Sequence, residues 1–267
     1  MPEAAPPARQ RWAAAVEYRG SAYAGWQAQS HAPSVQAAVE AALSRVADHP
    51  VAVSCAGRTD AGVHALGQVI HFDSPRARSA DAWLLGSNVH LPDDIKLRWV
   101  QPVAAAFDAR HSALGRRYRY VILNRRARGA LLAGAAAWVP QPLDAERMHE
   151  AAQALLGERD FSSFRAAGCQ SRTPMRCLTF IRVWRVEERL AVEVWANAFL
   201  HHMVRNLVGS LLEIGRGERP VSWMAELLAQ RDRTQAGETA PAEGLYFLGA
   251  DYPAAFGLPP PANLWLP

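Results

Sequence analysis

The sequence has almost no lysine, few cysteines and no long hydrophobic run. Lys96 is the only lysine among the 29 basic residues, and the other basic residues are arginines. Because Cys55, Cys169 and Cys177 contain no Cys-x-x-Cys spacing, they predict neither a disulfide framework nor a zinc site. No apolar run approaches the length of a membrane span. We therefore expect a cytoplasmic protein that crosses no membrane.

The N-terminus also lacks the hydrophobic segment of a signal peptide, because residues 1–7 contain three prolines and an acid. The chain has 267 residues, of which 50% are hydrophobic and 20% charged, as in an ordinary globular protein. This length is enough for one large core or two moderate ones.

Arginine is concentrated in one part of the chain. Residues 109–143 contain no acid and seven arginines, namely Arg110, Arg116, Arg117, Arg119, Arg125, Arg126 and Arg128. A preference for arginine codons explains the total number equally well, but it does not explain the clustering. Tyr118 and Tyr120 lie inside this segment. Arginine binds phosphates and aromatic rings stack on bases, so the segment has the composition of a nucleic-acid-binding surface.

Hydrophobic periodicity predicts the same order of elements, β-α-β-β-α-β, in each half of the chain. The first half is expected to contain a strand over 12–19, a helix over 33–46, strands over 51–56 and 67–72, a helix over 80–85 and a strand over 95–100. The second half is expected to contain a strand over 118–123, a helix over 144–156, a hairpin over 178–195, helices over 200–214 and 223–228, and a strand over 246–250.

This pattern predicts an α+β fold with two tandem ferredoxin-like, RRM-like domains. We place the first domain at residues 1–108 and the second, with a Pro-rich tail, at residues 109–267. Their antiparallel sheets are expected to join, and a cleft between the halves is the expected ligand site.

The most informative segment is AGRTDAGVHA, residues 56–65. It places Arg58 and Asp60 between Gly57 and Gly62, and glycine allows a positive φ and a close approach to a ligand. A carboxylate on such a loop is suited to catalysis. Taken alone, however, the Asp-Ala-Gly sequence is better explained as a turn in which the aspartate binds its own backbone.

A second polar group lies in the helix predicted over 200–214. His201 and Arg205 are four residues apart, so they are predicted to share a helix face. Read alone, Arg205 is best explained as a solvated surface charge. His201 and His202 invite a metal-site interpretation, but no second ligand pair accompanies them, so we expect no metal.

Five segments, in chain order, resemble motifs of the tRNA pseudouridine synthase A family: CAGRTDAGVHA, RRYRY, DFSSFRAAGCQSRTP, NAFLHHMVRN and AEGLY. The similarity extends from Glu17 to Tyr252. It implies an isomerase that converts uridine to pseudouridine at positions 38, 39 and 40 of the tRNA anticodon stem-loop. It also implies a homodimer that needs no cofactor or metal, with the RNA reaching across both subunits.

The resemblance assigns a role to each matching residue. Asp60 matches the essential catalytic carboxylate, and Arg205 matches an arginine that pairs with it and keeps it ionised. Tyr118 matches a tyrosine that stacks on the flipped target base, and its hydroxyl is expected to help remove the C5 proton. Arg58 is expected to fill the space left by the flipped base, and Leu245 to pack beside that base. Whether the carboxylate attacks C1′, attacks C6 or takes the 2′ proton in an elimination stays open.

Two other functions fit part of the pattern. A non-catalytic RNA-binding protein with tandem ferredoxin-like domains has a similar composition, but the aromatic motif of RNA-recognition modules is missing. A glycoside-type hydrolase also uses a carboxylate, but such enzymes need two acids and the shared motif contains one.

Overall fold

The computed structural model describes residues 9–261 and divides the chain into two compact units. Unit 1 comprises the chain up to Leu114 together with the residues from Gly249 onward, and unit 2 comprises Gly115–Leu248. The N-terminal segment considered above for a signal peptide lies outside the described residues, as do residues 262–267. Among the described helices, none combines the length and the hydrophobicity needed to cross a membrane.

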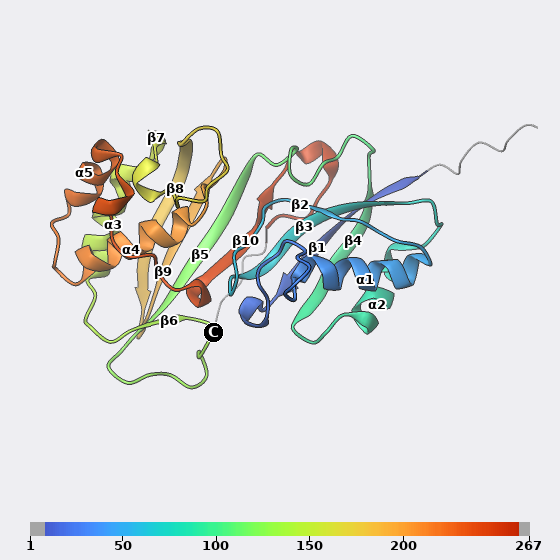
Figure 1. The fold of residues 1–267 in the computed structure, drawn as a ribbon, viewed down its shortest axis with the longest axis horizontal. Coiled ribbons are helices and arrows are strands. Elements are labelled where there is room, and N and C mark those ends of the chain that lie inside the picture. Colours follow the sequence, from blue (N-terminus) through green and yellow to red (C-terminus); the bar gives the residue numbers. More distant parts are fainter. Residues whose placement is uncertain (1–8, 262–267) are drawn as a thin grey trace, which may run out of the picture. The chain divides into compact units, whose positions relative to one another are not determined.

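Unit 1 contains the element order predicted for the first half of the chain. Its elements are β1 (Gln10–Tyr18), α1 (Val35–Ala47), β2 (Ser54–Cys55), β3 (His64–Ser74), α2 (Ala80–His90) and β4 (Ile95–Val103). Strand β1 pairs antiparallel with both β3 and β4, and β2 pairs antiparallel with β3 (Figure 1). The strand order is therefore β4-β1-β3-β2.

Helices α1 and α2 contact each other and contribute apolar side chains to the core of unit 1. The Ser34 side chain caps the start of α1 by accepting a hydrogen bond from the third residue after it. Val39 and Leu43 are four residues apart and fully buried. Trp83 of α2 is also fully buried and packs edge-on against Phe72 of β3, with ring centroids 5.0 Å apart.

The strands of unit 2 are mostly antiparallel. Its elements are β5 (Gly115–Asn124), β6 (Ala137–Val139), α3 (Ala145–Ala152), β7 (Gly157–Asp160), β8 (Met175–Val186), β9 (Arg189–Ala196), α4 (Met203–Gly215), α5 (Trp223–Gln230) and β10 (Leu245–Asp251). The strand order is β10-β5-β9-β8-β7, and β6 pairs parallel with β5. The last three residues of β10 belong to unit 1.

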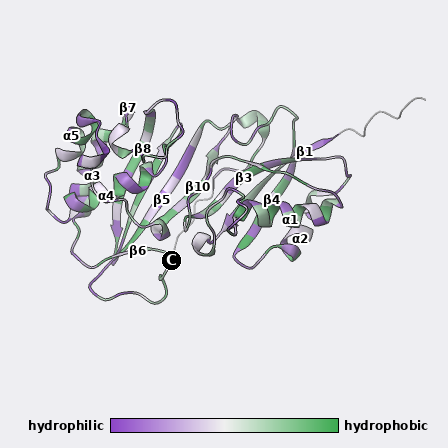
Figure 2. Ribbon diagram, in the orientation of Figure 1, coloured by the Kyte–Doolittle hydropathy of each residue, from purple (hydrophilic) through white to green (hydrophobic). Residues whose placement is uncertain are grey.

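Side chains in unit 2 alternate between the two faces of the sheet. On β5, Tyr118 and Tyr120 are buried, whereas Arg117 and Arg119 next to them in the sequence are partly exposed. The same alternation appears as green and purple bands along β8 in Figure 2. Helix α3 packs on β8 and helix α4 contacts β5, so both helices cover parts of this sheet. The chain is thus an α+β protein with largely antiparallel strand pairing.

The structure differs from the sequence prediction at several places. Helix α2 extends to His90 instead of residue 85, and helix α3 ends at Ala152 instead of residue 156. Strand β2 has two residues instead of the six predicted over 51–56. Helix α4 begins at Met203 and not at residue 200, because His202 adopts a left-handed backbone conformation with φ 59°. Strands β6 and β7 were not predicted, since these short segments lack a clear alternating hydrophobic pattern.

Candidate active site

The loop that carries Asp60 is fastened to unit 1 by buried polar side chains. The Gly57 N–H donates to Oε1 of Gln68 over 3.3 Å, and the Gln68 amide donates back to the Gly57 carbonyl. Gln68 is fully buried on β3. Two residues further, buried Thr59 shares a 2.7 Å hydrogen bond with the Tyr18 hydroxyl. The backbone on the N-terminal side of Asp60 is therefore fixed.

The other side of the loop is fixed by backbone geometry. Gly62 adopts a positive φ of 78°, and the Val63 N–H donates to the Asp60 carbonyl over 3.2 Å. A neighbouring segment touches the loop at Gly25, where a Cβ atom would lie 2.6 Å from the Thr59 carbonyl oxygen. Only glycine permits so close a contact at the φ of 100° found there. The predicted positive φ is confirmed at Gly62, whereas Gly57 does not adopt one.

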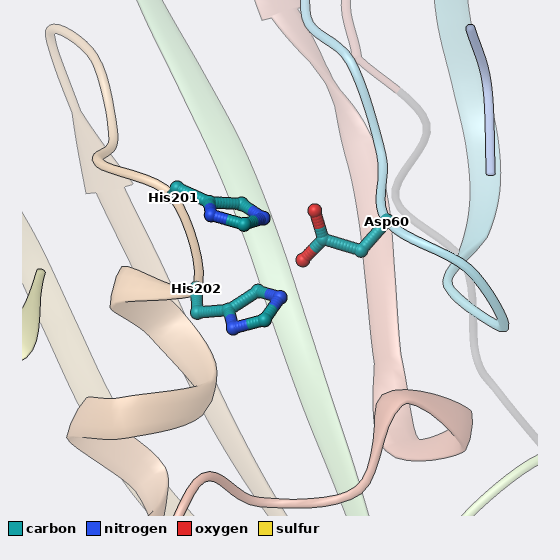
Figure 3. Close-up of side chains that lie close together, drawn as sticks. All are labelled: Asp60, His201 and His202. Carbon is teal, nitrogen blue, oxygen red and sulfur yellow. The ribbon is translucent and has the colours of Figure 1, made fainter. Parts of the chain in front are cut away.

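Asp60 is half-buried and Arg58 is exposed on the same loop. Figure 3 shows the carboxylate of Asp60 directed away from its own backbone. Burial raises the pKa of the neighbouring Cys55 thiol to about 11, although the positive charge of Arg58 acts in the opposite direction. Cys55 is therefore a thiol at neutral pH, and the Asp60 carboxylate is the better candidate for a reactive group on this loop.

In unit 2, a close backbone contact joins α4 to the segment 237–240, which we call the strap. A Cβ atom on Gly209 would lie 1.7 Å from the Glu238 carbonyl oxygen, so only glycine lets the strap cross the helix there. The Ser210 hydroxyl accepts a 3.1 Å hydrogen bond from the Gly237 N–H. These contacts fix the start of the strap against the middle of α4.

Asn206 fixes the other part of the strap. Its fully buried side chain donates to the Phe164 carbonyl over 2.9 Å and accepts from the Thr239 hydroxyl over 2.7 Å. The preceding residue, Arg205, uses Nε to donate to the Ala240 carbonyl over 2.7 Å. The orientation of the Arg205 side chain therefore depends on the strap.

The segment after the strap determines the position of Leu245. The Tyr120 hydroxyl donates to the Pro241 carbonyl over 2.7 Å, and a Cβ atom on Gly244 would lie 2.7 Å from the Tyr120 ring. Burial raises the pKa of Tyr120 well above its usual value, although nearby Arg205 lowers it in part. Tyr120 is therefore a neutral packing residue that positions the start of β10 at Leu245, which is 5% exposed.

Tyr118 lies in an aromatic cluster of unit 2. Its ring centroid is 5.0 Å from that of Phe199 and 5.0 Å from that of Phe247. Only 8% of Tyr118 is exposed. Phe247 is two residues after Leu245 on β10, so Tyr118 and Leu245 belong to neighbouring strands of the same sheet.

The two adjacent histidines lie in the turn before α4, not on the helix. The rings of His201 and His202 are 4.0 Å apart with an angle of 38° between their planes, and both are drawn in Figure 3. The prediction that His201 and Arg205 share a helix face is wrong, because α4 begins only at Met203, after the left-handed residue His202.

The structure thus places Asp60 and Arg58 on one loop of unit 1, and Tyr118, Arg205 and Leu245 in unit 2. The sequence analysis missed the buried polar side chains that fix these segments, namely Tyr18, Gln68, Asn206 and Ser210. Polar residues inside predicted strands and helices were the only signal for them.

A family model and several curated proteins that are similar to this chain carry the same description, tRNA pseudouridine synthase. A family model described as tRNA pseudouridine synthase matches residues 14–112 and 151–253. A tRNA pseudouridine synthase A of Cronobacter sakazakii is 59% identical over 246 residues, which cover 92% of this chain and 91% of that protein. Proteins with the same name from Hydrogenovibrio crunogenus and Aeromonas salmonicida are 55% and 56% identical, covering 91% and 96% of this chain and 93% and 96% of their own lengths.

The contact at Gly209 predicts that Gly209→Ala destabilises the protein. Alanine favours a helix by about 1 kcal/mol, but its Cβ has no room beside the Glu238 carbonyl, so we expect a net loss of about 1–3 kcal/mol. Urea unfolding measures this change. Gly168→Ala is the matched control, because a Cβ there meets nothing within 4 Å. Equal stability of the two variants would contradict the close contact.

Proposed function

Because this chain belongs to the tRNA pseudouridine synthase family, we propose that it converts uridine to pseudouridine at positions 38, 39 and 40 of the tRNA anticodon stem-loop. The protein is an isomerase that acts on tRNA. Family membership does not support the alternative of a non-catalytic RNA-binding protein. The observation that carries the specific proposal is the Asp60 loop, which presents one carboxylate on a backbone fixed at both sides.

The reaction replaces one bond of the nucleoside by another. The bond between N1 and C1′ breaks, a bond between C5 and C1′ forms, C5 loses a proton and N1 gains one. No atom is added and nothing is oxidised, so the proposed reaction needs no oxidant, reductant or co-substrate, and we propose that it uses no cofactor or metal. We propose that Asp60 is the catalytic carboxylate, acting at C1′, at C6 or on the 2′ proton.

The other site residues have proposed roles in holding the nucleotide. Arg205 pairs with the carboxylate and keeps it ionised. Tyr118 stacks on the flipped base, an interaction worth about 1–3 kcal/mol, which is similar to the few kcal/mol needed to extrude a base. Arg58 fills the space that the base leaves, and its exposure supports this role. Leu245 packs beside the base.

We further propose two tandem ferredoxin-like domains, residues 1–108 with the catalytic loop and residues 109–267 with Tyr118 and Arg205, whose sheets join beside the active-site cleft. The strand orders β4-β1-β3-β2 in unit 1 and β10-β5-β9-β8 in unit 2 support the ferredoxin-like topology proposed for each domain. A cytoplasmic homodimer that binds tRNA across both subunits completes the proposal.

Asp60→Asn is expected to abolish pseudouridine formation while tRNA affinity and thermal stability change little. Asparagine keeps the size of the side chain but cannot act as a nucleophile or base at neutral pH. Release of tritium from tRNA labelled at C5 of uridine measures turnover, and mapping of pseudouridine in the product locates it. Turnover by the variant would contradict the role of Asp60. Product at uridines other than the three named positions would contradict the proposed specificity.

Tyr118→Phe separates stacking from proton transfer. The phenyl ring still stacks, so we expect unchanged tRNA affinity, whereas loss of the hydroxyl is expected to lower the turnover rate about a hundredfold if it helps to remove the C5 proton. Single-turnover kinetics with excess enzyme measures the chemical step separately from product release. Full activity would assign Tyr118 to stacking alone.

A further inference from the structure

The segment 165–176 of unit 2, which we call the arginine loop, is fastened from inside by two arginines. Arg165 uses Nη2 to donate to the carbonyl oxygens of Cys169 and Ser171, over 2.9 Å and 2.7 Å. Arg176 uses Nη2 to donate to the Ser171 hydroxyl over 2.6 Å and Nη1 to donate to neighbouring carbonyls. The loop therefore has a fixed shape that depends on these two guanidinium groups.

Neither arginine is neutralised by an acid. The stretch 161–176 contains three arginines and no aspartate or glutamate. Among residues 9–261, no carboxylate forms an ion pair with Arg165 or Arg176, and Asp160, just before the stretch, pairs with Arg231 over 3.3 Å. Arg176 is only 8% exposed, and its buried Nε has no hydrogen-bond partner among these residues. A buried cation that contacts only neutral groups is stabilised by a nearby anion.

The third arginine is presented to solvent. Arg172 is exposed, and its side chain makes no hydrogen bond or ion pair with the described part of the chain. The loop is tied to the turn before α4, because the Ala166 N–H donates to the His201 carbonyl over 3.1 Å and the His201 N–H donates to Sγ of Cys169 over 3.4 Å. Helix α4 carries Arg205. The arginine loop and this proposed site residue therefore belong to one connected part of unit 2.

We propose that the arginine loop binds a phosphodiester group of the tRNA backbone, with Arg172 and the exposed part of Arg165 in contact with the phosphate and Arg176 adding positive charge behind them. The planar, multiply donating guanidinium group fits phosphate oxygens well. This inference rests on the proposed function, because tRNA is the polyanion that the proposed reaction brings to unit 2.

Cys169 provides a reporter inside the loop. Burial opposes ionisation of its thiol and is the largest single influence, but the N–H groups of His201 and Ser171 and the guanidinium of Arg165 together hold the pKa of Cys169 below its usual value. A thiolate and a phosphate in the same loop repel each other. Bound phosphate therefore opposes ionisation of the thiol, and the thiolate in turn weakens phosphate binding. Occupation of the loop by phosphate is therefore expected to raise the pKa of Cys169 and to slow its alkylation.

The first test measures the salt dependence of binding. A fluorescent, unmodified tRNA transcript is titrated with the full-length protein at several KCl concentrations between about 50 and 200 mM. A lost phosphate contact lowers the slope of log affinity against log salt by about one. We expect the slope for Arg172→Gln to be lower by about one than for the wild type, and its affinity for the transcript to be weaker. Arg182→Gln is the control, because Arg182 is also exposed and lies on β8, outside the loop.

Either of two results would overturn the proposal. The first is an unchanged slope and affinity for Arg172→Gln. The second is an equal loss in both variants, which would mean that binding responds to total charge and not to the arginine loop. Loss in Arg172→Gln alone supports the proposal.

The second test follows the thiol itself. Alkylation of Cys169 by iodoacetamide is measured by peptide mass spectrometry across pH, with Cys55 and Cys177 as internal references. We expect tRNA to move the midpoint pH for Cys169 upward in the wild type and less in Arg172→Gln. A lower rate at every pH without a change of midpoint would indicate steric cover alone and would contradict an anion in the loop.

Inorganic phosphate at matched ionic strength separates the two sources of the anion. If it moves the midpoint as much as tRNA does, and Arg172→Gln binds tRNA normally, the loop is a free-phosphate site and the assignment to RNA is wrong. Neither test requires turnover. A protein that passes both tests and forms no pseudouridine would contradict the proposed function but not phosphate binding by the arginine loop. Normal pseudouridine formation with both tests negative would contradict phosphate binding by the arginine loop but not the proposed function.

Discussion

The position of Asp60 depends on the buried contact between the Gln68 side chain and the backbone of Gly57. Gln68 belongs to β3, whose pairing with β1 also brings Tyr18 to Thr59. The Asp60 loop is therefore held by the central strands of unit 1 and not by its own turn. A buried amide that loses either partner leaves an unsatisfied group, which costs about 1–3 kcal/mol, so the loop has a strong reason to keep this one conformation.

Unit 2 uses the same principle with different residues. Asn206 and Ser210 lie on one face of α4, and with Gly209 between them they hold the strap at hydrogen-bonding distance. The strap in turn supplies the carbonyl of Ala240 to Arg205. In both units a proposed site residue thus directly follows or precedes a buried polar residue, since Asp60 follows Thr59 and Arg205 precedes Asn206. This arrangement suits a reaction in which charge must be held in place while a base is detached and rejoined.

Local sequence pattern predicted most helices and strands, but it did not reveal the buried residues that support the Asp60 loop and α4. The periodicity of Val39 and Leu43 predicted α1 because its signal repeats every turn. The predicted start of α4 was wrong because a single left-handed residue, His202, delays the start of the helix to Met203 without changing the hydrophobic pattern. Gln68 and Asn206 were missed because their partners are far away in the sequence, and no local pattern reports a distant backbone group.

Amino-acid composition did not show which arginines can bind RNA, because it does not separate arginines that form ion pairs within the protein from those that do not. Within the basic segment 109–143, Arg119 pairs with Glu193 over 2.6 Å and Arg125 pairs with Glu188 over 2.9 Å. Tyr120 is fully buried and does not offer a stacking surface. The arginine loop has fewer arginines, but it contains no acid, and no carboxylate among residues 9–261 forms an ion pair with them. Attraction to RNA depends on the charge left after internal pairing, so Arg119 and Arg125 contribute less to it than their number in the segment suggests.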